Sequence, residues 1–83
     1  MTKYVKLNNG MVKDVIPVTP SDSEDIDGFV VGLYVTTGGA VVFESPYGGA
    51  RTLVVPDGFS LTCLVKRVYA TGTTATGIHA YII

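Results

Sequence analysis

Residues 29–44 read FVVGLYVTTGGAVVFE, and this stretch decides the fold class. Large side chains alternate onto one face of its first half when the backbone is extended: Phe29, Val31, Leu33 and Val35. The step Thr37-Gly38-Gly39 offers the positive φ that a tight hairpin turn needs. Residues 40–44 are then expected to return as the antiparallel partner strand.

Further strands are predicted at residues 14–18, 51–55, 59–70 and 78–83, separated by turn signals about 8–12 residues apart. No window shows helical periodicity of useful length. Short turns between successive strands favour antiparallel pairing. The sequence therefore predicts an all-β fold, a small antiparallel β-sandwich or barrel of about six strands. We expect it to form a single domain over residues 14–83, preceded by an extended N-terminal arm at residues 1–13.

The composition indicates association with other chains. Hydrophobic residues make up 47% of the 83 residues and charged residues only 16%, against a usual charged fraction of about a quarter. A domain of this size cannot bury so much apolar surface in one core. We expect the excess to lie in subunit interfaces, because large exposed apolar patches mark interaction sites.

Charge and hydropathy argue against two classes of partner. The formal net charge is −1, so no basic excess is present to neutralise the phosphates of a nucleic acid. No window has the roughly 20 apolar residues of a membrane-spanning helix. Residues 1–6 lack the apolar stretch of a signal peptide, and we expect no membrane partner.

The acidic loop that precedes residue 29 is the one candidate for a cation. Its carboxylates are Asp22, Glu24, Asp25 and Asp27. Oxygen ligands on a loop can bind calcium, but this spacing does not match an EF-hand. A solvated loop is the simpler interpretation, and we predict neither a metal site nor a cofactor.

No residue is predicted to be catalytic. Cys63 and His79 could in principle form a nucleophile–base pair, but Cys63 is expected in mid-strand on an apolar face, where thiols are inert.

Being adjacent on a strand, Lys66 and Arg67 point to opposite faces. One is expected in solvent, and the other in a salt bridge with Glu44, with Asp57 or with a neighbouring subunit.

Two end motifs resemble a known family. Residues 65–81, VKRVYATGTTATGIHAY, look like the C-terminal signature of small tailed-phage and gene-transfer-agent virion proteins, which include capsid decoration and head-spike base proteins. Residues 18–23, VTPSDS, followed by an acidic residue, resemble the N-terminal signature. The resemblance covers residues 15–83. It departs at residues 48–52, where a glycine followed by an acidic residue is expected, and it does not extend to residues 1–13.

The resemblance implies a non-catalytic virion structural protein made in the host cytoplasm and attached to the capsid exterior. Such a decoration or cement subunit would stabilise the head as a homo-trimer or homo-pentamer bound to the major capsid protein. One alternative is a spike base at capsid vertices that carries a spike or fibre protein. Another is a host-surface carbohydrate-binding module using Tyr34, Tyr47 and Tyr81, since tyrosine rings can stack on sugars.

Overall fold

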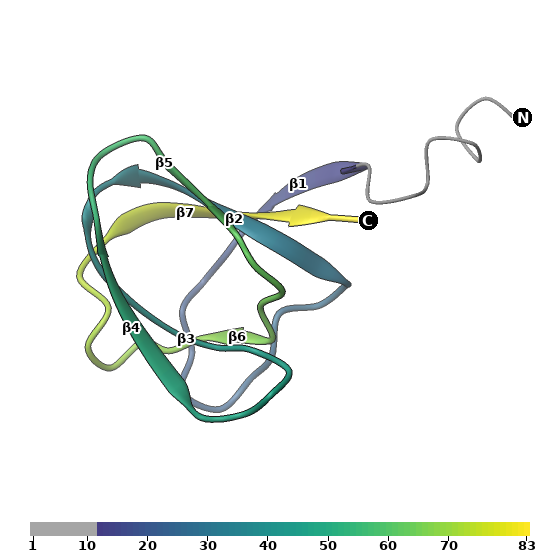
Figure 1. The fold of residues 1–83 in the computed structure, drawn as a ribbon, viewed down its shortest axis with the longest axis horizontal. Coiled ribbons are helices and arrows are strands. Elements are labelled where there is room, and N and C mark those ends of the chain that lie inside the picture. The colour runs from purple at the N-terminus through teal and green to yellow at the C-terminus, as the bar shows by residue number, and fades with distance from the viewer. Residues whose placement is uncertain (1–11) are drawn as a thin grey trace, which may run out of the picture.

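The fold is all-β, as predicted, and consists of two antiparallel sheets. The computed structural model describes residues 12–83 (Figure 1). Their strands are β1 (Asp14–Pro17), β2 (Val30–Thr37), β3 (Gly39–Glu44), β4 (Ala50–Val55), β5 (Phe59–Thr62), β6 (Arg67–Val68) and β7 (Thr76–Ile82). One sheet has the order β1-β7-β2-β5 and the other β4-β3-β6. Within residues 12–83 there is no helix long and apolar enough to cross a membrane.

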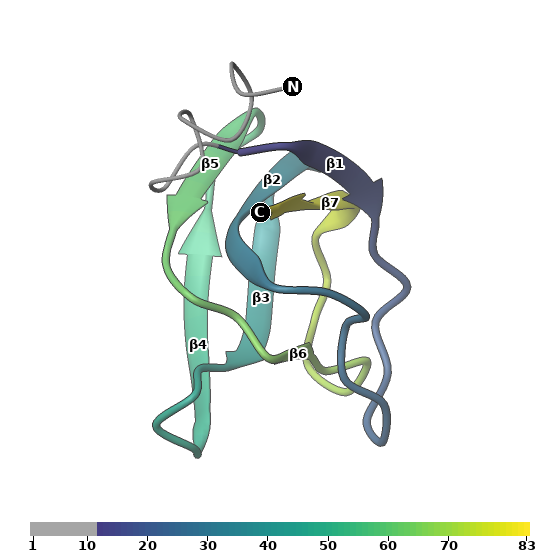
Figure 2. The ribbon, with the colours of Figure 1, turned by 90° about the vertical axis from the view of Figure 1, so that its right-hand side faces the viewer.

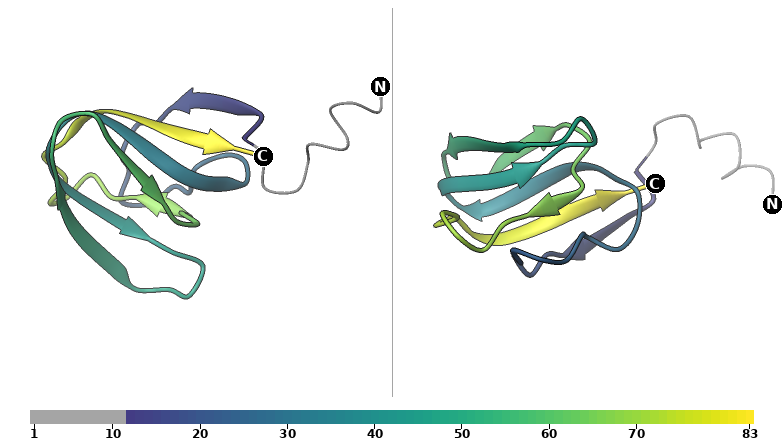
Figure 3. Two further views of the ribbon diagram at one scale, coloured as in Figure 1. Left: turned by 45° about the horizontal axis from the view of Figure 1, so that its top comes forward. Right: turned by 90° about the horizontal axis from the view of Figure 1, so that it is seen from below.

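The two sheets face one another across the hydrophobic core. Figure 3 shows the sheet that contains β7 and β2 lying apart from the hairpin of β3 and β4, and Figure 2 shows the loops that join them. The buried apolar side chains come from both sheets and from the loops between them: Val30, Leu33, Val35, Val41, Phe43, Val55, Val65, Val68, Ala75, Ile78 and Ala80. Branched valine and isoleucine suit such a pleated, packed surface.

The predicted hairpin between residues 29–36 and 40–44 is wrong. The strand β2 pairs with β5 and β7, whereas β3 pairs with β4 and β6. The glycines at the junction serve a crossing between sheets rather than a tight turn. A Cβ on Gly38 would lie 2.4 Å from the carbonyl oxygen of Val55, and Gly39 has a φ of +149°. Only glycine allows this close backbone approach and this dihedral angle.

The single long strand predicted at residues 59–70 is also wrong. It is divided into β5, which pairs with β2, and β6, which pairs with β3. Between them the backbone crosses from one sheet to the other: Val65 N–H donates to the Val30 carbonyl at 3.2 Å and Lys66 N–H to the Glu44 carbonyl at 2.7 Å. Val65 is buried at this crossing. The described residues therefore hold seven strands rather than about six.

The alternation predicted for residues 29–35 holds only in its second half. Leu33 and Val35 are buried, but Phe29 is 58% exposed and Val30 is buried in its place. The cause is a register shift between Val30 and Gly32 against β7. Such a β-bulge adds one residue to a strand and inverts which side chains face the core.

Residues 1–11 of the predicted N-terminal arm lie outside the described residues. The backbone N–H of Lys13 donates to the carbonyl of Ile82 at 2.7 Å, next to the pairing of β1 with β7. The short strand predicted at residues 14–18 is found as β1, an edge strand of its sheet. Edge position suits Pro17, which has no N–H to donate.

Two strand valines provide a test of this core. Val35 is 1% exposed and Val54 is 78% exposed. We expect Val35→Ala to lower the free energy of unfolding by about 2–3 kcal/mol, because it removes buried methyl groups and leaves a cavity. Val54→Ala, the matched control, is expected to cost under about 1 kcal/mol. Urea denaturation at one fixed protein concentration measures both, and equal losses would contradict the assigned core.

Candidate functional site

Within residues 12–83, no strand residue on the outer face of the four-stranded sheet is charged, and Lys13, which precedes β1, continues the side of Val15 and Pro17 at the edge of the sheet. The register places one set of strand residues on the side of this sheet that points away from the core, and we call it the tyrosine face: Val15, Pro17, Tyr34, Thr36, Ser60, Thr62, His79 and Tyr81. None of these is Asp, Glu, Lys or Arg. Depletion of charge together with enrichment of tyrosine is typical of the centre of a protein interface.

The ring of Tyr81 lies across the middle strand of this face. Its hydroxyl oxygen is 3.1 Å from Ser60 Oγ, which lies on β5, two strands away from β7. A Cβ on Gly32 of β2 would come within 3.0 Å of Tyr81 Cδ2 and within 2.5 Å of the Leu61 carbonyl oxygen. Gly32 therefore makes room for the ring, and a hydrogen bond between two residues of the face, Ser60 and Tyr81, holds the ring across β2.

A second uncharged surface lies where the β3–β4 turn meets the crossing between β5 and β6. We call it the apolar corner: Phe29, Pro46, Tyr47, Cys63 and Leu64. Tyr47 is 96% exposed and Leu64 is 43% exposed. Two adjoining hollows of about 330 and 160 Å³ share Pro46 and Leu64 in their walls. Exposed aromatic and aliphatic side chains around a hollow are the usual form of an interaction surface.

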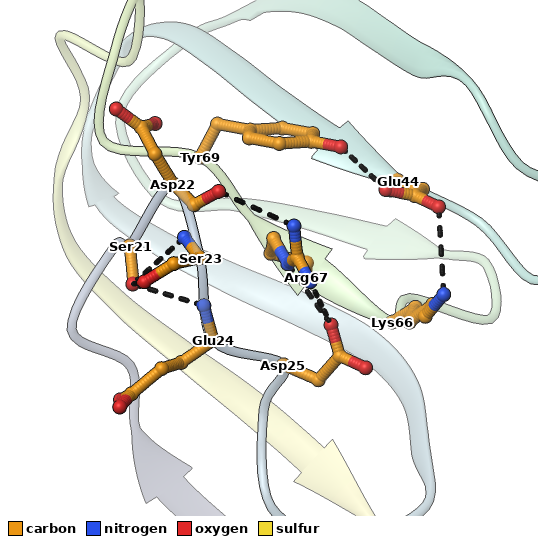
Figure 4. A network of polar contacts seen from close by, with 9 residues as sticks. All are labelled: Ser21, Asp22, Ser23, Glu24, Asp25, Glu44, Lys66, Arg67 and Tyr69. Carbon is orange, nitrogen blue, oxygen red and sulfur yellow. Dashed lines mark hydrogen bonds and ion pairs between the residues drawn. The ribbon is translucent and has the colours of Figure 1, made fainter.

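Charged side chains gather instead around β6 and the loop between β1 and β2 (Figure 4). Arg67 Nη2 lies 2.8 Å from Asp25 Oδ1, and Arg67 Nη1 donates to the Asp22 carbonyl at 3.3 Å. The guanidinium carbon is 5.7 Å from the centre of the Tyr69 ring. Arg67 thus fixes the acidic loop onto the three-stranded sheet through a geometry that a lysine could not reproduce.

Glu44 and Tyr69 form the other half of this network. The Tyr69 hydroxyl donates to Glu44 Oε1, and Lys66 Nζ lies 3.6 Å from Glu44 Oε2. The hydrogen bond from Tyr69 lowers the pKa of the Glu44 carboxyl below its usual value. The same bond to the carboxylate raises the pKa of Tyr69. The predicted salt bridge to Glu44 is therefore made by Lys66, and Arg67 pairs with Asp25 instead.

Asp22 connects the acidic loop to the segment that follows β6. Its carboxylate accepts the Thr71 hydroxyl at 2.5 Å and the Thr71 N–H at 2.9 Å. These bonds lower the pKa of Asp22, because they stabilise its charged form. Among residues 12–83 no group of three or more His, Cys, Asp or Glu side chains is arranged to hold a metal ion.

A groove of about 200 Å³ runs beside the same loop. We call it the acidic groove. Apolar side chains of β1, β6 and the loop line it, and three carboxylate residues join them: Ile16, Val18, Ile26, Val68, Glu24, Asp25 and Asp27. Glu24 and Asp27 make no side-chain hydrogen bond or ion pair within the described part of the chain. The groove thus combines an apolar lining with unpaired negative charge.

Comparison with known proteins gives one informative result. No protein-family model and no curated protein matches the chain. Among solved structures, a chain of the "Capsid of native GTA particle computed with C5 symmetry" is 37% identical, with a TM-score of 0.78. The match covers 86% of this chain and 83% of that chain. The chain belongs to the family of phage and gene-transfer-agent virion proteins. The resemblance read from the two end motifs is confirmed at this level.

The tyrosines proposed for sugar binding do not come together in this virion protein. Tyr34 and Tyr81 share the tyrosine face, and Tyr47 lies in the turn between β3 and β4. Tyr81 also hydrogen-bonds within its own sheet. A three-tyrosine platform is therefore absent from the described residues, although Tyr34 and Tyr81 share the tyrosine face.

Cys63 and His79 are engaged with different neighbours. Cys63 lies in the bend after β5 rather than in mid-strand, and its Sγ donates to the Leu64 carbonyl at 3.4 Å. His79 Nδ1 lies 3.2 Å from the Gly77 carbonyl oxygen. No hydrogen bond links the two side chains within residues 12–83.

The pKa shift of Asp22 predicts a loss of stability in acid. Because its pKa is lowered in the folded chain, the unfolded chain binds more protons as pH falls below about 4. Its contribution is present above that range and disappears as pH falls through the folded pKa. We expect the melting temperature of Asp22→Asn to fall less steeply between pH 5 and 3 than that of the unmodified protein. Identical slopes for Asp22→Asn and the unmodified protein would contradict this account.

Proposed function

We propose that this virion protein is a decoration or cement subunit on the exterior of a tailed-phage capsid. Its partners would be the major capsid protein and further copies of itself, arranged around a symmetry axis. The observation that carries the proposal is the 37% identity, over 86% of the chain, to a chain of a gene-transfer-agent capsid particle. In this proposal the protein needs no cofactor and binds neither nucleic acid nor a membrane.

The distribution of charge supports a role in assembly. The tyrosine face and the apolar corner are two separate uncharged surfaces, while the ion pairs gather around β6. A subunit that joins both a capsid and its own copies needs at least two such surfaces. Two different contact patches on one chain let copies join head to tail, and such contacts form a closed ring when the rotation between copies closes.

Introducing a charge into the tyrosine face tests its part in attachment. Thr62 on β5 and Thr52 on β4 are both exposed strand residues on outward faces, one on each sheet. We expect Thr62→Lys to weaken binding to capsids at least about ten-fold, because an unpaired ammonium would be desolvated in the contact. Thr52→Lys is the matched control and should bind as the unmodified protein does. Co-sedimentation with capsids that lack the protein measures both, and equal binding by the two variants would refute a role for this face.

The solution mass separates the proposed arrangements. Light scattering over a concentration series is expected to give a stable trimer or pentamer, because a chain with 47% hydrophobic residues leaves large apolar side chains such as Val54 and Leu64 exposed. A trimer would favour decoration at threefold positions. A pentamer would favour the alternative of a spike base at the vertices. A monomer at all concentrations would refute self-association and leave the capsid as the partner of both surfaces.

A further inference from the structure

The acidic groove has no occupant among residues 12–83, and its chemistry specifies one. Its lining is apolar where Ile16, Ile26 and Val68 meet, and Glu24 and Asp27 lie along it without an ion pair in the described part of the chain. Asp25, the third carboxylate, is held by Arg67 at 2.8 Å. A ligand for this groove should therefore combine apolar side chains with two positive charges.

The segment that precedes the described domain has this composition. Residues 3–7 read KYVKL, with two lysines and three apolar side chains. The whole of residues 1–11 carries two lysines and no acidic residue, a formal charge of +2. Residues 12–83 contain the other four basic residues and all seven acidic ones, a charge of −3, and the sum is the −1 of the chain. The segment and the domain are thus oppositely charged.

We propose that residues 3–7 of one copy bind in the acidic groove of a neighbouring copy. Lys3 and Lys6 pair with Glu24 and Asp27, and the apolar side chains of the segment cover Ile16 and Ile26. This inference rests on the proposed function, because it requires copies to lie side by side. To that function the inference adds the residues that join neighbouring copies. The groove lies beside β1, an edge strand that an extended segment can also approach through its backbone.

Chain length permits this exchange between copies. Eleven residues precede Val12, and an extended chain of that length spans at most about 36–40 Å. The chain enters β1 beside Ile82, whose carbonyl accepts from Lys13, whereas the groove lies at the other end of β1, around Ile16 and Val18. The segment therefore leaves the domain at the end away from its own groove.

Binding within the same copy is disfavoured by charge. A fold-back through the turn signal Asn9-Gly10 would place Leu7 opposite Val12 and Lys6 opposite Lys13. Like charges directly opposite on paired strands are destabilising. Only Lys3 would then come level with Ile16, which leaves Lys6 far from the acidic loop. A neighbouring copy can offer the groove to both lysines at once.

Mixing two charge-reversed variants of the full chain tests the exchange. The groove variant is Glu24→Lys/Asp27→Lys and the segment variant is Lys3→Glu/Lys6→Glu. We expect each alone to associate more weakly, by on the order of ten-fold in the dissociation constant, because attraction becomes repulsion. An equimolar mixture should regain association in part, since each variant's segment then fits the other variant's groove, while a ring of three or five copies keeps at least one contact between two copies of the same variant. Light scattering measures all three samples, and Arg51→Glu is the control for a charge reversal away from the groove.

Three outcomes would overturn the inference. If neither variant changes association, the groove takes no part in joining copies. If the mixture associates no better than either variant alone but a chain with all four substitutions recovers, the segment binds its own groove. If the unmodified protein is a monomer, no exchange occurs. Co-sedimentation of the same variants with capsids separates this inference from the proposed function. If the variants associate with one another and bind capsids as the unmodified protein does, the exchange is refuted but the decoration role is not.

Discussion

The crossing at residues 63–66 is the constraint on which the rest of the structure depends. Val65 is buried there, and the backbone N–H groups of Val65 and Lys66 donate to Val30 in one sheet and to Glu44 in the other. A buried backbone donor without a partner would cost a few kcal/mol. Because both donors are satisfied only when the two sheets are in place, the crossing holds β5 and β6 in separate sheets and sets the spacing of the core.

The same crossing determines where the charges lie. Once β6 pairs with β3, Arg67 reaches Asp25 in the loop between β1 and β2, and Tyr69 reaches Glu44 at the end of β3. Asp22 then binds Thr71 beyond β6. These contacts fix a loop that has no strand of its own between β1 and β2, and they give the acidic groove its shape. Glu24 and Asp27, which line the groove together with Asp25, have no ion pair within residues 12–83.

Local patterns in the sequence predicted the fold class and most strands, but they could not predict the connections between sheets. The hairpin glycines and the alternation in residues 29–44 are compatible with pairing or with crossing, and only the contacts of Gly38 with Val55 decide between them. The bulge at Val30 and Gly32 depends on the partner strand β7 in the same way. Arg67 and Asp25 are 42 positions apart, so no local spacing signals their ion pair. The tyrosine face becomes visible only when the register of four strands is known.

The separation of charge from uncharged surface has a consequence for how copies can meet. Burying the network around Arg67 in a contact would require its exposed carboxylates to lose water, which is costly without new partners. The tyrosine face and the apolar corner carry less of this cost, because none of their residues is Asp, Glu, Lys or Arg and Tyr81 already bonds to Ser60. Broad contacts in a particle should therefore form on the two uncharged surfaces. The charged side is then suited to a narrow ligand that brings its own cations, which is what a lysine-bearing segment provides and a flat protein face does not.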